Sequence, residues 1–361
     1  MNYMSNDKIK KLLLLGGLFI LITVAFVYFV GFPWLVSYYR EAGRNKVSSG
    51  DFNNAISDLD KSLNFGTEDP VTYALKGRAI LGEATPGEEK YYPNTTQDQH
   101  KEALQYYEKS LSLGLENADN NLYSYVLQDS GYLYRELKEY DKANEKFLEK
   151  IEKFPDKSFW PRYLVAIDYF DRVNRPQEAL NILLPAPESM DVKLEVLPRI
   201  YTTLAILYGY FKNYEEVEKY AKLAIENSFD DKRWEIQYAH ISLAYAAATK
   251  GDIKLAEKEI QKADELSGSP NTHQCDLSEI YYLNKNYSEA IELAKTTISN
   301  PPTRIQFQCL KVLGDTSLKL GNKNEAKKYY EEYLNLTDSL EQKNIFIIRN
   351  REEIKKALET L

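Results

Sequence analysis

The chain repeats itself, and this internal repeat is the feature that most constrains its fold. One position, alanine in every copy but one, returns eight times at intervals of 34 to 48 residues: Ala55, Ala103, Ala143, Ala179, Val217, Ala256, Ala290 and Ala326. A repeat of this length indicates a solenoid, in which each unit buries its apolar face only by stacking on its neighbours. At 361 residues the chain exceeds a typical single core, which fits an elongated array or two to three domains.

The clearest copy of the repeat runs from Leu127 to Pro155. Its marks are Gly131 and Tyr134, the turn Glu139-Tyr140-Asp141, then Ala143 and Phe147. This copy resembles the tetratricopeptide repeat, in which small residues let two antiparallel helices approach closely. The resemblance implies an all-α fold: a right-handed superhelical solenoid of about eight helical hairpins over residues 36–338. Small residues at the same place in other units include Gly43, Gly77 and Gly314, whereas Ile167 and Val217 depart from the pattern in units four and five.

Residues 339–361 predict a helix that caps the array, because the last apolar face of a solenoid needs a cover. Its apolar stripe comprises Ile345, Ile348, Ile354, Leu358 and Leu361, and its opposite side carries Arg349, Arg351, Glu352 and Lys355. An amphipathic helix that binds a partner is the alternative.

The amino-terminal segment predicts a membrane anchor. Residues 1–11 form a basic tail, and an uncharged apolar run within residues 12–35 is long enough to cross a bilayer. A cleaved signal peptide is the alternative, but its apolar core would be shorter and a small-residue cleavage site would follow. Basic residues flank the run on both sides. The short basic tail favours a cytoplasmic amino terminus with the body outside.

The resemblance also implies a partner-binding groove lined by the first helix of each hairpin. Carried over position by position, the lining residues are Tyr125, Gln128, Tyr132, Arg135, Asp168, Asp171, Thr202, Tyr238, Tyr245, Glu279, Tyr282, Lys311 and Asp315. Tyrosine rings suit the binding of an extended peptide or a partner helix, although they also suit plain packing between helices. The Lys and Asn of the carboxylate clamp, with which some members of the family bind chaperone tails, are replaced by pairs such as Gln128 and Tyr132.

The second repeat carries an insertion, residues 82–100, whose proline and glycine content predicts a surface loop. It contains Asn94-Thr95-Thr96, a possible glycosylation acceptor at Asn94. Plain variation in loop length and a docking role near the membrane both remain open for this segment.

Other classes of function find little support in the sequence. Residues 1–46 carry a net charge of +4, so the remainder carries −12, which disfavours nucleic acid as a partner. Cys275 and Cys309 predict two isolated thiols, with a disulfide as the alternative, and the three histidines are scattered, so we expect no metal site. No phosphate loop, zinc-protease motif or nucleophile elbow occurs. We therefore expect no enzymatic activity, cofactor or small-molecule substrate.

The sequence thus predicts a membrane-anchored scaffold that binds protein or peptide partners. The favoured version is an extracytoplasmic subunit of an envelope, secretion or surface-appendage complex. The alternatives are a receptor or adaptor that faces the cytoplasm and a fixed structural subunit whose groove is permanently filled.

Overall fold

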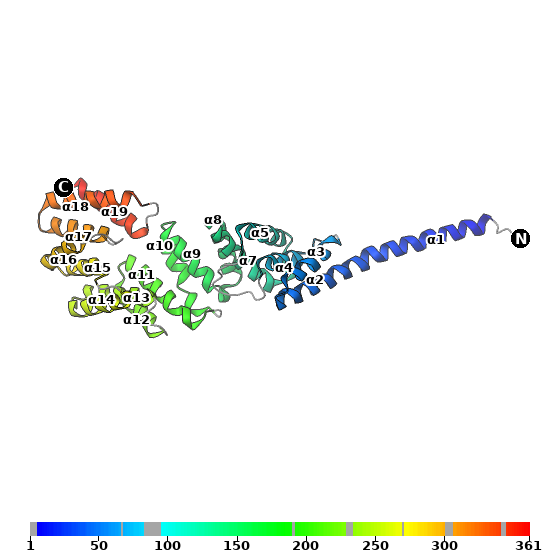
Figure 1. Ribbon diagram of the computed structural model, residues 1–361, viewed down its shortest axis with the longest axis horizontal. Helices are drawn as coiled ribbons and strands as arrows, with labels where there is room; N and C mark the ends of the chain where they lie inside the picture. Colours follow the sequence, from blue (N-terminus) through cyan, green and yellow to red (C-terminus); the bar gives the residue numbers. More distant parts are fainter. Residues whose placement is uncertain are drawn as a thin grey trace. The chain divides into compact units, whose positions relative to one another are not determined.

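The computed structural model describes residues 6–65, 68–82, 95–189, 192–228, 234–268, 271–299, 306–340 and 344–361. Every regular element in these ranges is a helix (Figure 1), which confirms the predicted all-α fold class. The chain divides into two compact units, residues 1–153 (unit 1) and 154–361 (unit 2).

Unit 1 contains the amino-terminal helix and three helical hairpins. Its elements are α1 (Asn6–Phe26), a π-helical segment η1 (Val27–Gly31), α2 (Phe32–Ser49), α3 (Phe52–Asn64), α4 (Pro70–Leu81), α5 (Gln97–Ser112), the short α6 (Leu115–Ala118), α7 (Asn120–Glu136) and α8 (Tyr140–Lys153). The pairs α2/α3, α4/α5 and α7/α8 pack as hairpins. α5 begins inside the predicted insertion loop, at Gln97, with Thr96 and Gln99 forming a capping box at its start.

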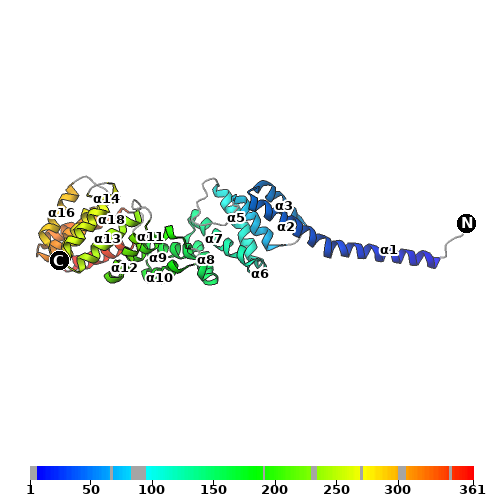
Figure 2. The same cartoon turned by 90° about the horizontal axis from the view of Figure 1, so that it is seen from below.

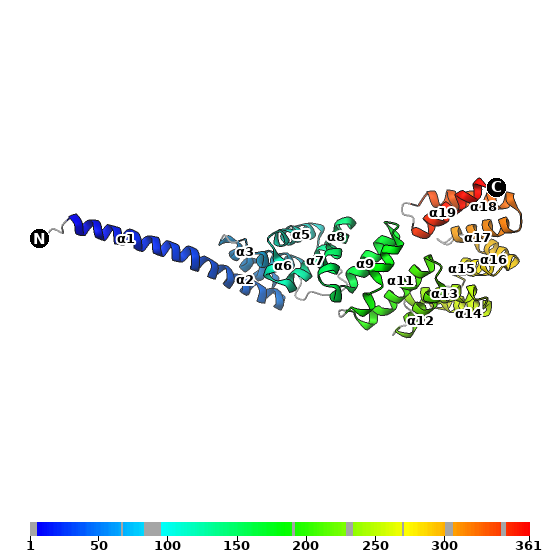
Figure 3. The ribbon, with the colours of Figure 1, turned by 180° about the vertical axis from the view of Figure 1, so that it is seen from behind.

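Unit 2 contains five further hairpins and a last helix (Figure 3). Its α-helices are α9 (Phe159–Asp171), α10 (Pro176–Leu183), α11 (Leu197–Tyr210), α12 (Tyr214–Glu226), α13 (Trp234–Thr249), α14 (Ile253–Ser267), α15 (Gln274–Leu283), α16 (Tyr287–Ser299), α17 (Gln306–Lys319), α18 (Lys323–Asp338) and α19 (Ile345–Glu359). Short 3₁₀ turns are η2 (Pro155–Lys157), η3 (Ala186–Glu188) and η4 (Leu194–Val196). Neighbouring first helices, α11 with α13, α13 with α15 and α15 with α17, lie side by side.

The short turns within the hairpins, α4/α5 with its insertion excepted, share one backbone conformation. A residue with positive φ follows the first helix, for example Gly50 at 80° and Gly251 at 78°. The next residue then donates its N–H back to the helix it has left, as Asp252 does to the carbonyl of Ala247 at 3.0 Å. Asp252 also accepts the N–H of Leu255 at 3.1 Å, so one residue ends the turn and caps the second helix.

The predicted close approach of paired helices is confirmed at the glycines. A Cβ added to Gly131 would lie 2.3 Å from Cε1 of Phe147, and one added to Gly314 would lie 2.4 Å from Cε1 of Tyr330. Because real Cβ atoms do not approach carbon this closely, only glycine permits these crossings. Gly43 and Gly77 meet Leu59 and Tyr107 in the same way.

The fourth repeat, formed by α9 and α10, also has a small residue where its helices cross, but one position earlier than the sequence pattern predicts. Four residues, 172–175, separate α9 from α10, whereas three residues, 137–139, separate α7 from α8. The small residue in α9 is therefore Ala166, which is 1% exposed, and Ile167 is only partly buried. The departure that the sequence showed at Ile167 comes from the longer turn.

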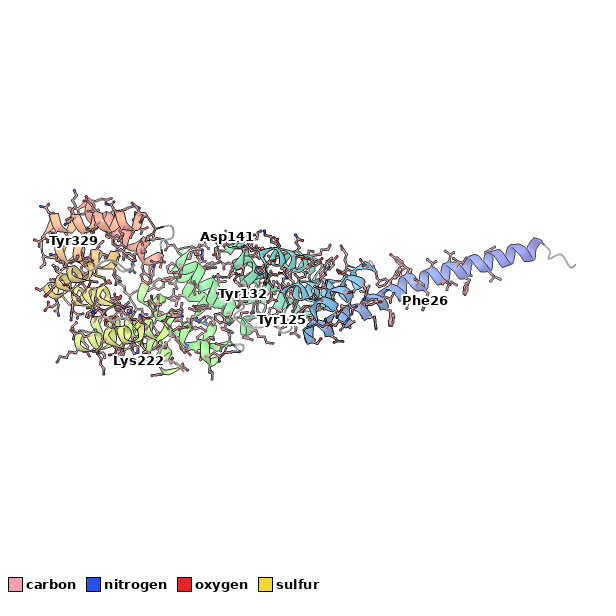
Figure 4. The ribbon with its side chains drawn as sticks, in the orientation of Figure 1. Phe26, Tyr125, Tyr132, Asp141, Lys222 and Tyr329 are labelled. Carbon is pink, nitrogen blue, oxygen red and sulfur yellow. A yellow bond between two sulfur atoms is a disulfide. The ribbon has the colours of Figure 1, made fainter. Side chains whose placement is uncertain are left out.

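The amino-terminal helix leads into the first hairpin without a loop, since α1, η1 and α2 form one continuous helical stretch (Figure 2). Within the described residues, one helix is long and apolar enough to cross a membrane; it lies in Leu14–Ser49, and its apolar window is entirely unburied. Phe26, which is 62% exposed, projects from it (Figure 4).

Pro33 accounts for the π-helical segment just before it. Proline lacks an N–H, and its ring clashes with the carbonyl four residues earlier in a regular helix. Here the N–H of Phe32 donates to the carbonyl of Val27, five residues back, which widens the turn and accommodates the ring.

The prediction of two isolated thiols is wrong. Cys275 and Cys309 form a disulfide that joins α15 to α17, with their Cα atoms 4.9 Å apart. Both cysteines are fully buried beside Ala294 and Leu313. Their nominal repeat positions differ by two, but neighbouring first helices pack side by side with an offset, so the two side chains meet.

Candidate partner-binding surface

In unit 1 the four predicted groove residues, with Tyr125 and Tyr132 among them (Figure 4), all lie on α7, but they differ in exposure. Tyr125 is 38% exposed, whereas Tyr132 is 7% exposed and its ring packs edge-on against Phe147 at 5.6 Å. Gln128 accepts a hydrogen bond from Lys150, and the Arg135 guanidinium lies over the ring of Tyr140 at 5.6 Å. Of the four, Tyr125 is therefore the residue whose side chain is exposed.

The predicted residues of α9 and α11 contribute mostly to the interior of unit 2. Asp168 is 0% exposed and forms an ion pair with Arg172 at 3.3 Å. Thr202 is also fully buried, and its hydroxyl donates to the carbonyl of Glu235 at 2.9 Å. Asp171, at the end of α9, is exposed.

The predicted residues of α13, α15 and α17 come together on one surface. We call it the inner surface of unit 2; it comprises Tyr238, Tyr245, Asp276, Glu279, Tyr282, Gln308, Lys311 and Asp315. Each of these side chains remains partly or fully exposed. The sequence indicated six of them, and Asp276 and Gln308 are additions that only their packing reveals.

Tyr245 lies at the centre of a hydrogen-bonded network on this surface. Its hydroxyl donates to Glu279 at 2.9 Å and approaches Asp276 at 3.1 Å. Gln308 donates from α17 to the same carboxylates at 2.9 and 3.1 Å. Burial, followed by the charge of Glu279, raises the pKa of Tyr245 well above its ordinary value. The phenol therefore stays protonated and remains a donor at neutral pH.

A second polar group lies further along α17. Lys311 pairs with Asp315 at 2.6 Å, and Tyr330 donates to the other oxygen of Asp315 at 2.7 Å. Burial alone would lower the pKa of Lys311, but Asp315 raises it above its ordinary value, so the ammonium stays charged. Burial and the charge of Asp315 raise the pKa of Tyr282 to about 12.

An exposed aromatic pair lies at the start of α13, beside the polar network. Trp234 and Tyr238 are each 46% exposed, and their rings meet edge-on at 5.9 Å. Burial, and then the charge of Asp276, raises the pKa of Tyr238. On α13, Tyr238 lies about two turns before Tyr245, so the aromatic pair and the polar network follow one another along the same helix. Rigid aromatic rings next to hydrogen-bonding groups are typical of sites that dominate binding energy in protein interfaces.

The last helix lies against this surface, which the sequence did not predict. Glu353 of α19 pairs with Lys311 at 3.3 Å and with Arg349, one turn earlier, at 3.9 Å. Arg349 donates to the carbonyl of Tyr210, at the end of α11, at 3.2 Å. Arg351, expected on the solvent side, instead donates to the carbonyl of Leu334 at 2.9 Å.

Within the described residues no group of three or more His, Cys, Asp or Glu side chains could hold a metal ion. Asn94, the predicted glycosylation acceptor, lies outside the described residues, as does most of the insertion. The arrangement on the inner surface therefore offers hydrogen bonds, mixed charge and aromatic contact area.

The family of the repeat is supported by a direct match. The tetratricopeptide repeat model matches residues 312–339, which cover the carboxyl-terminal part of α17 and all of α18. Together with the recurring hairpins and their glycine crossings, this match confirms the tetratricopeptide-repeat prediction. Proteins built from this repeat bind protein or peptide partners, so the fold is that of a protein-interaction scaffold.

Several solved structures are similar to the chain. A structure from a study of Pseudomonas aeruginosa PilF is 15% identical, with a TM-score of 0.44, over 70% of this chain and 99% of that one. The apo quorum sensor NprR from Bacillus thuringiensis is 14% identical, with a TM-score of 0.46, over 84% and 87%. The C-terminal part of a Cytophaga hutchinsonii repeat protein is 13% identical, with a TM-score of 0.43, over 86% and 98%. No curated protein sequence matches the chain.

Proposed function

We propose that this protein is a membrane-anchored scaffold that binds a protein or peptide partner on the inner surface of unit 2. The observation that carries the proposal is that the exposed Trp234–Tyr238 pair and Tyr245, the centre of the polar network, lie on the same helix, α13, with Tyr238 about two turns before Tyr245. The apolar amino-terminal helix would hold the scaffold in the membrane. We assign it no catalytic role, no cofactor and no nucleic acid partner.

We further propose that the body lies outside the cytoplasm, where it assists an envelope, secretion or surface-appendage complex. Two observations support this side. A basic tail precedes the apolar run, and the Cys275–Cys309 disulfide fits an oxidising compartment better than a reducing one. A receptor or adaptor facing the cytoplasm is the second candidate; the basic residues Arg40, Arg44 and Lys46 beyond the span favour it.

Sidedness can be tested with the thiols themselves. Cells are quenched with acid, and free thiols are labelled with maleimide in one sample without chemical reduction and in a second sample after it. The extracytoplasmic assignment predicts that both cysteines become reactive only after reduction. The extracytoplasmic assignment would be excluded if a reporter that works only in the cytoplasm showed activity when fused after Leu361.

Partner binding can be tested by capture from solubilised membranes. The variant Trp234→Ala/Tyr238→Ala removes the exposed rings and should lower recovery of the captured protein at least tenfold, since such anchors each contribute about 2 kcal/mol or more. The matched control is Leu255→Ala, another exposed apolar residue, 43% exposed, on α14. Equal recovery by both variants would contradict the assignment of the surface.

A further inference from the structure

The last helix, α19, contacts the inner surface of unit 2 through Glu353 and Lys311 and also contacts the helices beside that surface. The amino-terminal end of α19 enters the core formed by α9, α10 and α11: Ile345 is 1% exposed there, and Phe346 packs against the same cluster. The ring of Phe346 meets those of Phe170 at 5.6 Å and Tyr210 at 5.9 Å. These residues belong to the first two hairpins of the unit, whereas α19 follows the last one.

The middle of α19 continues along the polar residues of the inner surface. The Arg349 guanidinium lies over the rings of Tyr210 at 4.9 Å and Phe346 at 5.3 Å. Arg349 and Glu279 both act on the pKa of Tyr214, and Glu279 and Glu353 both act on that of Lys311. The charges of α19 and those of α15 and α17 therefore lie within electrostatic reach of one another.

The far end of α19 is held as a cap would be. Ile354, 1% exposed, joins the cluster of Tyr330 and Tyr333 on α18, with Ala357 and Leu358 packed against it. A cap needs only this contact with the last hairpin. A cap does not require the contacts that Phe346 and Arg349 make with α9 and α11, so these contacts need another explanation.

We infer that α19 is an internal ligand: its amino-terminal half covers α9 and α11 beside the inner surface, and a partner helix that binds there must displace it. This inference rests on the proposed function of the inner surface. The partner it selects is an amphipathic helix with the chemistry of α19, namely a run of four apolar residues followed directly by an arginine. In α19 the arginine pairs with Glu353, and Arg349 and Glu279 of the inner surface both lie near enough to Tyr214 to act on its phenol, so a carboxylate of the surface complements the arginine.

A tethered ligand competes strongly because short tethers give effective concentrations of about a millimolar. The apparent affinity for a partner falls by the fraction of molecules in which the surface is vacant. Weakening the internal contacts should therefore raise the affinity for an external helix, although the receiving surface itself is unchanged.

The test uses the full chain in detergent and a fluorescent peptide of residues 344–361 as the probe. The variant Phe346→Ala/Arg349→Ala loosens only the internal helix and should bind the peptide at least tenfold more tightly than the unaltered chain. The matched control is Glu352→Ala/Lys355→Ala, on the exposed side of α19, which should bind as the unaltered chain does. Equal binding by all three folded chains would overturn the inference.

A cross-linking experiment tests the same inference in the opposite direction, so that misfolding of Phe346→Ala/Arg349→Ala cannot account for both results. In Phe170→Cys/Phe346→Cys, a short bismaleimide should join the two new thiols, and the joined chain should lose at least tenfold in peptide affinity relative to the unreacted one. Unchanged peptide affinity after cross-linking would show that α19 is a permanent cap. If the cross-link also leaves partner capture intact while Trp234→Ala/Tyr238→Ala abolishes it, the proposed function stands and only the internal-ligand inference fails.

Discussion

At the residue scale, the sequence was most informative where sterics permit one solution. Gly131 and Gly314 could be assigned to helix crossings because a spacing of 12 residues separates each from a small residue of the second helix. Side-chain pairing was less predictable. Arg349 and Arg351 looked like solvent-side charges on a helical wheel, but guanidinium groups reach backbone carbonyls on other helices, at Tyr210 and Leu334. No local pattern encodes such partners.

Gly314→Ala should destabilise unit 2. Its Cβ would lie 2.4 Å from the Tyr330 ring, and overpacking a core typically costs about 1–3 kcal/mol. Gly209→Ala is the matched control in the same unit: its nearest atom would be Val217 Cγ2 at 3.9 Å. Because alanine favours helix more than glycine, the control should gain about 0.5–1 kcal/mol. Thermal unfolding followed by circular dichroism should move in opposite directions for the two variants.

The buried Glu259 predicts an acid-sensitive contact. Burial alone would raise the pKa of Glu259, but hydrogen bonds from His240 at 2.5 Å and Lys262 at 2.9 Å hold it below its ordinary value. A lowered folded-state pKa gives stability that is present above the unfolded pKa and is lost as pH falls through the folded one.

Unit 2 should therefore lose stability progressively below about pH 4.5, and Glu259→Gln should flatten that part of the profile. Urea midpoints measured between pH 6 and 3 would show this; the exposed Glu265→Gln on the same helix serves as the control. A profile as steep in Glu259→Gln as in the unaltered chain would contradict the prediction.

At the scale of elements, hairpins were predictable and the contacts between them were less so. Turn signals such as Gly251-Asp252 placed the second helices, since a positive φ and a cap are local requirements. The predicted position of the small residue on α9 was wrong by one residue, because the repeat period does not give the length of the turn that follows the helix. The Cys275–Cys309 pairing was missed because position along a repeat does not give the offset between neighbouring first helices.

The disulfide should stabilise unit 2 by closing a loop with a sequence separation of 34 residues. In the chain-entropy account a loop of this size contributes about 3–4 kcal/mol. Reductant should therefore lower the melting temperature of the unaltered chain, whereas Cys275→Ser/Cys309→Ser should melt lower and no longer respond to reductant. A melting temperature that reductant leaves unchanged in the unaltered chain would show that the link adds no stability.

At the scale of the whole molecule, the repeat and the apolar run were enough to predict an all-α array with one long amino-terminal helix. They could not predict where α19 lies. Its bond from Arg349 to Tyr210 joins residues 139 positions apart, and such a pairing depends on how successive hairpins stack rather than on any motif. The inner surface was likewise predictable in its tyrosines but not in what covers it.

If the apolar helix is an anchor, the protein should remain in the membrane pellet after carbonate extraction and keep its amino terminus. Intact-mass measurement separates this from a signal peptide, because cleavage would remove at least the apolar run of residues 12–30. Deleting residues 6–31 should release the body into the soluble fraction. Recovery of a shortened species from untreated membranes would contradict the anchor.

The loop-free passage from α1 through η1 into α2 bears on how such a molecule would search for its partner. A protein joined to its membrane helix by a long flexible linker samples many orientations, and it loses that orientational freedom when it binds. In unit 1 the first hairpin is a direct extension of the membrane helix, so this hairpin has little rotational freedom relative to that helix. Pro33 and its widened turn would then set the tilt of the first hairpin against the bilayer, and a partner of that hairpin would meet it at this tilt.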